Sequence, residues 1–326
     1  MKKTLLRWLI QSNDHHLLHD FIPLISDWLA RSACINDAWV KPEVYRLFQQ
    51  HGFHLVRNHY YGVLPDTSKL DEKWWASVPY QAAFDRIKRA DVETIFANVL
   101  RWADDLKSLP RESETGFYWN NDMFPPLDAI ALYGMLREYR PQRLLEIGSG
   151  FSTEIAVLAA QHSKTTIHCI EPYPSPRLLA RESELAELTR ALVQEIPLNT
   201  FEKLEPGDFL FIDTTHTVKL GSDVNYLIFN VLPCIKPGVF IHIHDIFLPY
   251  EYPKRWYDEI SIFWNEQYLL LAYLLENPAI EIILPNYLLS LKSKDTLRER
   301  FKAFDIWGLT NNLGGASGAS LWLRKQ

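Results

Sequence analysis

The stretch RLLEIGSGFSTEIA, residues 143 to 156, contains the pattern that decides the fold. Its first residues form a short apolar run typical of a buried strand, and two glycines, Gly148 and Gly150, come directly after it. Glycine lets the backbone turn sharply and pass close to a ligand. Ser152 or Thr153 can then cap the helix that the next apolar residues predict. The stretch therefore predicts a strand, a tight turn and a helix.

Short apolar runs of the same kind recur through the rest of the chain and alternate with helical stretches. They are TIHCIEP at 166, ALVQEI at 191, DFLFID at 208, GVFIHIHD at 238, AIEIILP near 279 and SLWLRKQ at the carboxyl end. Strands that are buried on both faces of a parallel sheet have this composition, because helices cover both sides. We predict an α/β fold with a doubly wound, mostly parallel, seven-stranded sheet.

The first third of the chain has a different pattern. FIPLISDWLARS and VETIFANVLRWADDLKSL carry apolar residues at helical spacing, and SLPRESETGF has the composition of a junction. We therefore predict a mainly helical region over residues 1–115, which serves as a lid or as substrate or oligomer contacts. The α/β domain is expected over residues 116–326.

Composition excludes several classes of protein. Of 326 residues 47% are hydrophobic, which is enough for a large core. The formal net charge of -6 disfavours a nucleic-acid binder. Three scattered cysteines fit neither a disulfide framework nor a CxxC metal site, so we expect a cytoplasmic protein. Charged residues and prolines interrupt the most apolar segment, so no membrane span is expected. We therefore expect the partner to be a small-molecule substrate. The sequence leaves open whether the chain forms a homo-oligomer.

A carboxylate comes after the second predicted strand. Glu171, in CIEPYP, lies about twenty residues after the glycine turn, where it can accept hydrogen bonds from both hydroxyls of a ribose. NAD-binding folds use the same device, but they prefer G-x-G-x-x-G, and the third position here is Thr153. The residues alone thus predict a ribose-bearing cofactor and leave an NAD(P)-dependent oxidoreductase as an alternative.

From about residue 125 onward, the acidic residue followed by G-x-G resembles the first motif of class I methyltransferases that use S-adenosylmethionine. The resemblance implies that Glu146 helps to hold the methionine portion and that the glycines let the backbone pass against it. The cofactor-binding residues that it implies are Glu146, Gly148, Ser149, Gly150, Glu171 and Asp213.

Polar side chains come after the fourth and fifth strands. Asp213 and His216 come after DFLFID, and His244 and Asp245 close VFIHIHD. Because neighbouring parallel strands end at the same edge, we expect these side chains to converge beside the cofactor. Carboxylates with an imidazole suit Mg²⁺ or Mn²⁺, so Asp213, His244 and Asp245 are the predicted metal ligands. The predicted catalytic residues are Asp213, His216 and Asp245, and His216 takes the proton of the acceptor hydroxyl.

The D-x-x-H at 213–216, with the polar pair at 244 and 245, is similar to metal-dependent O-methyltransferases of the macrocin-modifying type. In that family both residues of the pair are acidic, whereas His244 stands at the first position here. The resemblance implies O-methylation of a small-molecule hydroxyl, on a sugar or a secondary metabolite. Two alternatives stay open, namely His216 as a general base without metal, and a non-catalytic cofactor-binding protein with the same fold.

Upstream, HYYGVLPD and NNDMFPPLDAIALYGMLREYRP are similar to a bacterial group of uncharacterised methyltransferase-like proteins. That similarity implies that a set of aromatic and amide side chains borders the site, namely Tyr60, Tyr61, Trp119, Asn120 and Asn121. The loop after the fifth strand is also rich in aromatic residues, which either contact the substrate or pack into the core. They are Tyr250, Tyr252, Trp256 and Tyr257, with Arg255 among them.

Overall fold

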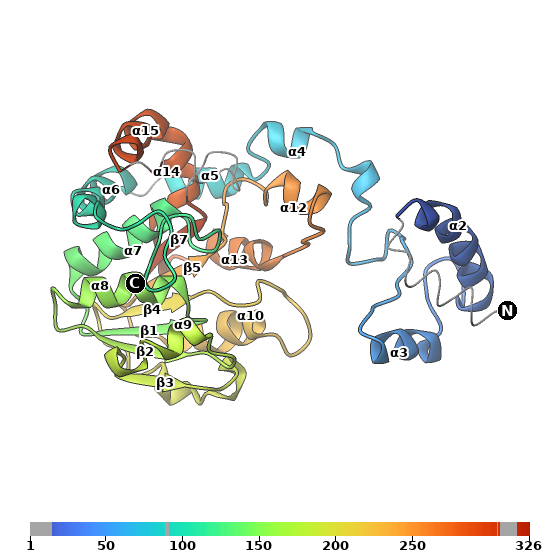
Figure 1. The fold of residues 1–326 in the computed structure, drawn as a ribbon, viewed down its shortest axis with the longest axis horizontal. Coiled ribbons are helices and arrows are strands. Elements are labelled where there is room, and N and C mark those ends of the chain that lie inside the picture. The colour runs from blue at the N-terminus through green and yellow to red at the C-terminus, as the bar shows by residue number, and fades with distance from the viewer. Residues whose placement is uncertain (1–14, 89–90, 305, 307–317) are drawn as a thin grey trace. The chain divides into compact units, whose positions relative to one another are not determined.

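The computed structural model describes residues 15–88, 91–304, 306 and 318–326 (Figure 1). The chain forms two compact units, Met1–Asp71 and Glu72–Gln326, and each is described by itself. The units therefore divide at residue 71, whereas the sequence predicts a boundary at 115. A distinct role for residues 1–115 stays a prediction.

The smaller unit is helical in its described part. It contains α2 (His15–Ser32), α3 (Pro42–Gln50) and the 3₁₀ turn η1 (Thr67–Lys69). Tyr61 lies in this unit, where its ring stacks on Trp39 with 6.1 Å between the ring centroids. Neither α3 nor η1 has a buried residue.

The larger unit is built on a seven-stranded sheet with the order β3-β2-β1-β4-β5-β7-β6. Neighbouring strands from β3 through to β5 pair in parallel, and β7 pairs antiparallel to both β5 and β6. The strands are β1 (Arg143–Ile147), β2 (Thr166–Ile170), β3 (Glu187–Thr189), β4 (Phe209–Ile212), β5 (Phe240–His244), β6 (Ile280–Pro285) and β7 (Ser320–Lys325). The predicted α/β fold with a mostly parallel, seven-stranded sheet is confirmed.

One strand lies elsewhere than predicted. The apolar run at 191–196 is not a strand, because residues 193–195 form a 3₁₀ turn and the third strand comes earlier, at Glu187–Thr189. Val193 and Ile196 are both buried, and their spacing of three places them on one side of the turn. Their apolar character thus reflects packing against the sheet.

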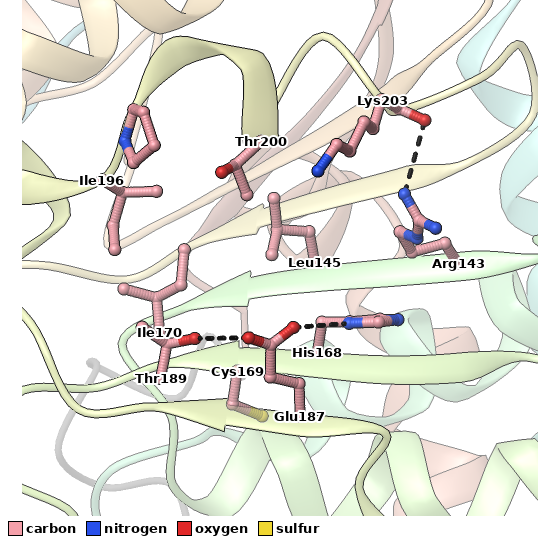
Figure 2. Close-up of a pocket in the computed structure, with 11 residues that line it drawn as sticks. Arg143, Leu145, His168, Cys169, Ile170, Glu187, Thr189, Ile196, Thr200 and Lys203 are labelled. Atoms are coloured by element: carbon pink, nitrogen blue, oxygen red, sulfur yellow. Dashed lines mark hydrogen bonds and ion pairs between the residues drawn. The ribbon is translucent and has the colours of Figure 1, made fainter.

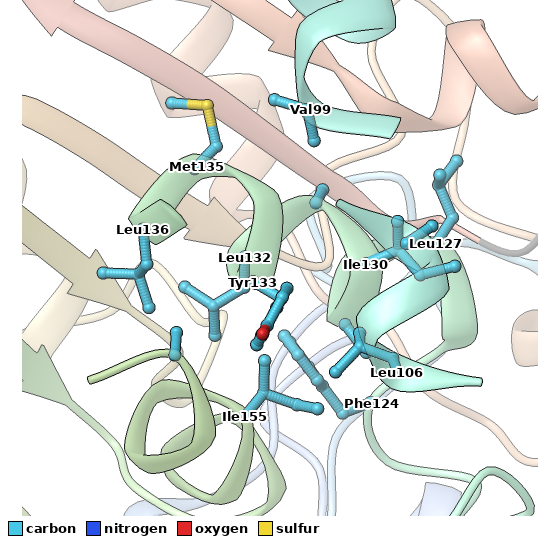
Figure 3. Packing of buried hydrophobic residues seen from close by; sticks show 14 of the residues in the cluster. Val99, Leu106, Phe124, Leu127, Ile130, Leu132, Tyr133, Met135, Leu136 and Ile155 are labelled. Carbon is cyan, nitrogen blue, oxygen red and sulfur yellow. The ribbon is translucent and has the colours of Figure 1, made fainter. Parts of the chain in front are cut away.

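Successive strand residues face opposite layers of helices, as the two-residue period of a strand requires. Leu144, Phe209 and Phe211 belong to a core shared with α6, α7 and α8, whereas Leu145, Leu210 and Ile212 belong to a second core on the other face. Figure 3 shows the first core, where α7 is surrounded by neighbouring side chains. Every residue of α7 from Pro126 to Leu136 is buried.

The helices and helical turns of this unit cover both faces of the sheet. They are α4 (Lys73–Ala76), α5 (Gln81–Lys88), α6 (Val92–Leu100), η2 (Ala103–Leu106), α7 (Pro126–Tyr139), α8 (Phe151–Ala160), α9 (Pro176–Leu179), η3 (Glu182–Glu184), η4 (Val193–Glu195), η5 (Leu198–Thr200), α10 (Asp223–Tyr226), η6 (Leu227–Val231), α11 (Leu232–Cys234), α12 (Lys254–Asp258), α13 (Glu266–Leu275), α14 (Asn286–Lys292) and α15 (Lys294–Ala303). Within the described residues, no helix has both the length and the apolarity that crossing a membrane requires.

Candidate active site

The turn after β1 is fixed by a close approach of two backbones. Gly148 has a φ of 75°, and a Cβ atom placed on it would lie 1.7 Å from the carbonyl oxygen of Asp213. The Asp213 N–H also donates to the carbonyl of Ile147, at 2.9 Å. A side chain at position 148 is therefore excluded both by the backbone conformation and by space.

A cavity of about 380 Å³ opens beside this turn. Its size lies in the range of small-ligand sites, roughly 300–1,000 Å³. Among the residues that line it are Phe124, Gly148, Ser149, Gly150, Glu171 and Asp213. A Cβ atom on Gly150 would meet nothing within 4 Å, so the backbone here faces open space. The structure thus brings five of the six predicted cofactor residues to one cavity.

Glu171 is held at the wall of this cavity by the backbone. The N–H groups of Ser149 and Tyr173 donate to its two carboxylate oxygens, at 3.2 and 2.8 Å. Because a carboxylate oxygen can accept more than one hydrogen bond, both oxygens can still accept from ligand hydroxyls. This geometry fits the role that the sequence predicts for Glu171.

Glu146 is the predicted cofactor residue that does not line the cavity. Its carboxylate is fully buried and accepts hydrogen bonds from the hydroxyls of Ser152 and Thr153, both at 2.6 Å. Burial raises the pKa of Glu146 to about 7, although these hydrogen bonds oppose the change. Glu146 therefore fastens β1 to the start of α8, and its contact with a cofactor stays a prediction.

Of the predicted upstream residues, Asn121 has a visible link to the cavity. Its side-chain oxygen accepts from the N–H groups of Met123 and Phe124, at 3.0 and 2.7 Å, and both of these residues line the cavity. Trp119 is buried in the first core, and Asn120 donates to Glu112. Tyr60 and Tyr61 belong to the smaller unit.

The predicted catalytic side chains meet at the carboxyl ends of β4 and β5. The Nε2 atom of His216 lies 3.2 Å from an oxygen of Asp213 and 3.6 Å from an oxygen of Asp245. Its Nδ1 atom lies 2.9 Å from an oxygen of Glu266. Both ring nitrogens therefore face carboxylates, an arrangement that favours the doubly protonated, positively charged imidazole.

The pKa values of the cluster result from these contacts. Burial acts to lower the pKa of His216, but Asp213 and Glu266 raise it well above its usual value. Burial raises the pKa of Asp245 to about 6, although His244 and His216 oppose this. The pKa of Asp213 is lowered, because positive charge on His244 and His216 outweighs the effect of burial. The cluster thus consists of a buried cation held between carboxylates.

Glu266 is a residue that the sequence analysis missed. It begins α13, fifty residues after His216, and its N–H and that of Asn265 both donate to the His216 carbonyl, at 3.2 and 3.1 Å. Trp264 adds a ring contact to the imidazole, with 4.3 Å between centroids. The start of α13 thus holds His216 through its carbonyl, its ring face and its Nδ1 atom. The sequence offers a weak signal, an acidic residue at the start of an apolar helix.

His244 lies in a largely aromatic environment. Burial acts to lower its pKa, but the charges of Asp213 and Asp245 raise it overall. Its ring is fully buried between Phe124 and His242, with centroid distances of 5.1 and 5.7 Å. Neither ring nitrogen has a hydrogen-bond partner among the described residues, and the nearest oxygen of Asp245 is 3.9 Å from Nε2. His242 stacks on Phe211 at 4.0 Å, and burial lowers its pKa well below the usual value.

These positions do not fit the predicted metal site. Across the described ranges, no three or more His, Cys, Asp and Glu side chains are arranged to hold a metal ion. The space between Asp213 and Asp245, which a shared cation would need, faces the Nε2 atom of His216. The protonated imidazole therefore supplies positive charge where the prediction placed Mg²⁺ or Mn²⁺.

The aromatic loop after β5 packs into the protein. Tyr252 and Trp256 are buried, and the Trp256 ring contacts Phe247 and Trp264 with centroid distances of 5.2 and 4.9 Å. Tyr257 is buried as well and contacts Trp75. The sequence left open whether these rings contact the substrate or pack into the core. Tyr252, Trp256 and Tyr257 pack into the core.

The sheet order and the glycine-turn cavity at the carboxyl ends of β1, β2 and β4 are those of a class I methyltransferase fold. In agreement, residues 145–246 match a family model described as a methyltransferase domain. The predicted class is therefore confirmed.

Individual relatives cover parts of the chain. An uncharacterized protein of Archaeoglobus fulgidus is 44% identical over 96 residues, which are 27% of this chain and 42% of that protein. The chain thus spans less than half the length of this curated relative.

Two solved structures are similar to the chain. Precorrin-6y C5,15-methyltransferase from Geobacter metallireducens has 17% identity, covers 50% of this chain and 82% of its own, and has a TM-score of 0.31. Phosphoethanolamine N-methyltransferase 2 from Haemonchus contortus has 18% identity, covers 76% and 59%, and has a TM-score of 0.33.

The two glycines of the turn should respond differently to substitution. Gly148→Ala should destabilise the fold by several kcal/mol, because its Cβ would overlap the Asp213 carbonyl. Gly150→Ala should change stability by about 1 kcal/mol or less, because its Cβ enters open space. Urea unfolding of the two variants measures this contrast, and equal losses would contradict the described turn.

Glu146 should make stability depend on pH. Its folded pKa of about 7 exceeds the ordinary value of 4.5, so the folded chain binds this proton more tightly. Binding of this proton therefore stabilises the folded protein fully below pH 4.5. The stabilisation is lost as the pH rises from 4.5 to 7, and stability no longer depends on this group above pH 7. Relative to the native protein, Glu146→Gln should therefore gain up to about 3 kcal/mol of unfolding free energy between pH 4.5 and pH 8. Urea titrations at both pH values, with the exposed Glu299→Gln as control, measure this gain. A gain independent of pH would refute it.

Proposed function

We propose that this protein transfers the methyl group of S-adenosylmethionine to a hydroxyl group of a small molecule, such as a sugar or a secondary metabolite. The observation that carries the proposal is the cluster of His216, Asp213 and Asp245, whose member Asp213 also lines the cavity of the glycine turn. Proton-accepting groups thus lie beside the space in which a cofactor fits.

The residues of the cavity suit this cofactor. S-adenosylmethionine, when bound, supplies a methyl group on a positively charged sulfonium centre. Glu171, held by the Ser149 N–H, would accept hydrogen bonds from the ribose hydroxyls, and Gly150 would let the backbone pass close to the ligand. Asp213, whose pKa is lowered, presents a negative charge to the cavity and favours a cationic ligand.

A neutral hydroxyl is a poor nucleophile, so the acceptor must lose its proton as its oxygen forms the bond to the methyl carbon and the carbon–sulfur bond breaks. We assign the proton to Asp245, because a carboxylate with a pKa of about 6 is ionised and still basic near neutral pH. His216 stays positively charged and holds Asp213 and Asp245 in place. This differs from the role predicted for His216 from the sequence, because both of its nitrogens already face carboxylates.

The alternatives have less support. In a dinucleotide-binding fold the order 3-2-1-4-5-6 is parallel throughout, whereas here the antiparallel β7 lies between β5 and β6. A non-catalytic cofactor-binding protein would show cofactor binding without methyl transfer to any hydroxylated acceptor. The small-molecule acceptor and a homo-oligomer remain predictions from the sequence.

Binding of S-adenosylmethionine should depend on Glu171. Calorimetry on the full chain should give a dissociation constant in the micromolar range, and Glu171→Ala should weaken binding by about a hundredfold or more, because two charge-assisted hydrogen bonds are lost. The exposed Glu202→Ala should bind as the native protein does. No heat of binding at millimolar cofactor, or stabilisation by NADPH instead, would exclude the proposal.

Glu266 should control the pH dependence of methyl transfer. Glu266→Gln keeps the size of the side chain and removes its charge, so the pKa of His216 should fall and turnover should decline at a lower pH than in the native protein. Rates with a panel of hydroxylated acceptors, measured from pH 6 to 10, test this shift, and binding of cofactor should be unchanged.

The same assay tests the metal. Because His216 supplies the positive charge, a chelator should leave turnover unaltered. A loss of turnover that Mg²⁺ or Mn²⁺ restores would show that the predicted metal site forms after all. An unshifted pH profile in Glu266→Gln would remove Glu266 from the mechanism.

A further inference from the structure

A second pocket, of about 320 Å³, lies on the face of the sheet opposite to α7 and α8. Its floor is formed by side chains of β1, β2 and β3 that share one face, because Leu145 pairs with His168 and His168 pairs with Glu187 in register. The rim is formed by residues 196–203. Figure 2 shows these side chains around the pocket.

The pocket exists because one connection lacks a long helix. Parallel sheets are usually covered by helices on both faces. The connection from β3 to β4, residues 190–208, contains only the short turns η4 and η5, each of three residues. Val193 and Ile196 of this connection are buried, but the part of the face around His168 and Glu187 is left partly exposed.

Two basic side chains line this pocket without an acidic partner. Neither Arg143 nor Lys203 forms an ion pair among the described residues, and the Arg143 guanidinium donates only to the backbone carbonyl of Lys203, at 3.4 Å. The buried Nε atom of Arg143 has no hydrogen-bond partner in the same set. In Figure 2 the two basic residues lie toward one end of the pocket, and Ile170 and Ile196 lie toward the other.

The acidic side chain of the pocket is already engaged. Glu187 lies 3.5 Å from His168 and accepts a hydrogen bond from the Thr189 hydroxyl, at 3.1 Å. It therefore does not neutralise Arg143 or Lys203. The pocket combines a positively charged end, which offers unused donors, with an apolar end, and this combination is complementary to an organic anion.

We propose that this pocket binds a small organic anion, whose phosphate or carboxylate group contacts Arg143 and Lys203 and whose apolar body lies over Leu145, Ile170 and Ile196. The terminal nitrogens of a planar guanidinium group can donate two parallel hydrogen bonds to such a head group. The site is separate from the glycine-turn cavity and does not depend on the proposed methyl transfer. It lies near the start of β1, whereas the cofactor cavity lies at the end of that strand.

The experiment is calorimetry on the full chain with phenyl phosphate, benzoate and uncharged phenol, each with and without saturating S-adenosylmethionine. At least one of the two anions should bind saturably, and phenol should bind at least about tenfold more weakly. Lys203→Gln and Arg143→Gln should each weaken binding of the anion by about tenfold or more, because each removes a charge-assisted hydrogen bond. Lys302→Gln, the same charge change on α15, is the matched control and should bind normally. Lys203 is exposed, so its variant should keep the native melting temperature even if Arg143→Gln unfolds.

Three results would overturn the proposal. The first is the absence of saturable binding of either anion at millimolar concentration, or equal binding of phenol. The second is loss of binding when S-adenosylmethionine is added, since the anion would then occupy the cofactor cavity. The third is a dimer that dissociates in Lys203→Gln, because this face would then be an interface between two copies of the chain.

Discussion

The site depends on the contact between Gly148 and the carbonyl of Asp213. This contact joins the end of β1 to the end of β4, and only glycine provides both the positive φ and the space that it needs. Once these two strand ends are joined, the cavity has its floor, and Asp213 is positioned to face it. The loop that carries His216 starts from the same point, so the geometry of the charged cluster depends on this one turn.

The charged cluster adds a second requirement. A buried imidazolium is tolerated only when carboxylates surround it closely, and here they come from the ends of β4 and β5 and from the start of α13. Three parts of the chain must therefore be in place together before the site exists. His244 differs in its immediate contacts, since its ring lies between Phe124 and His242 and its nitrogens have no hydrogen-bond partner among the described residues. The charges of Asp213 and Asp245 nevertheless raise its pKa.

Residues at the ends of strands can be placed from the sequence, whereas contacts that depend on tertiary packing cannot. Asp213, His216 and Asp245 could be predicted to meet because the ends of neighbouring parallel strands share an edge. Glu266 could not, because nothing local shows that α13 begins beside a loop fifty residues earlier. The run at 191–196 misleads because an apolar turn packed on a sheet has the same composition as a buried strand. The contact between Phe124 and the His244 ring was likewise decided by packing between residues distant in the chain.

His216 and Asp245 both adopt the left-handed backbone conformation, with φ values of 57° and 52°. For residues other than glycine this conformation costs on the order of 1 kcal/mol each. The backbone at these two positions thus lowers the free energy of unfolding, and both side chains lie in the charged cluster. Glycine at position 216 would relieve this strain, but it would leave the buried carboxylate of Glu266 without its cation, which costs more than the strain that is relieved. The unfavourable backbone conformation is therefore kept by the charges that it brings together.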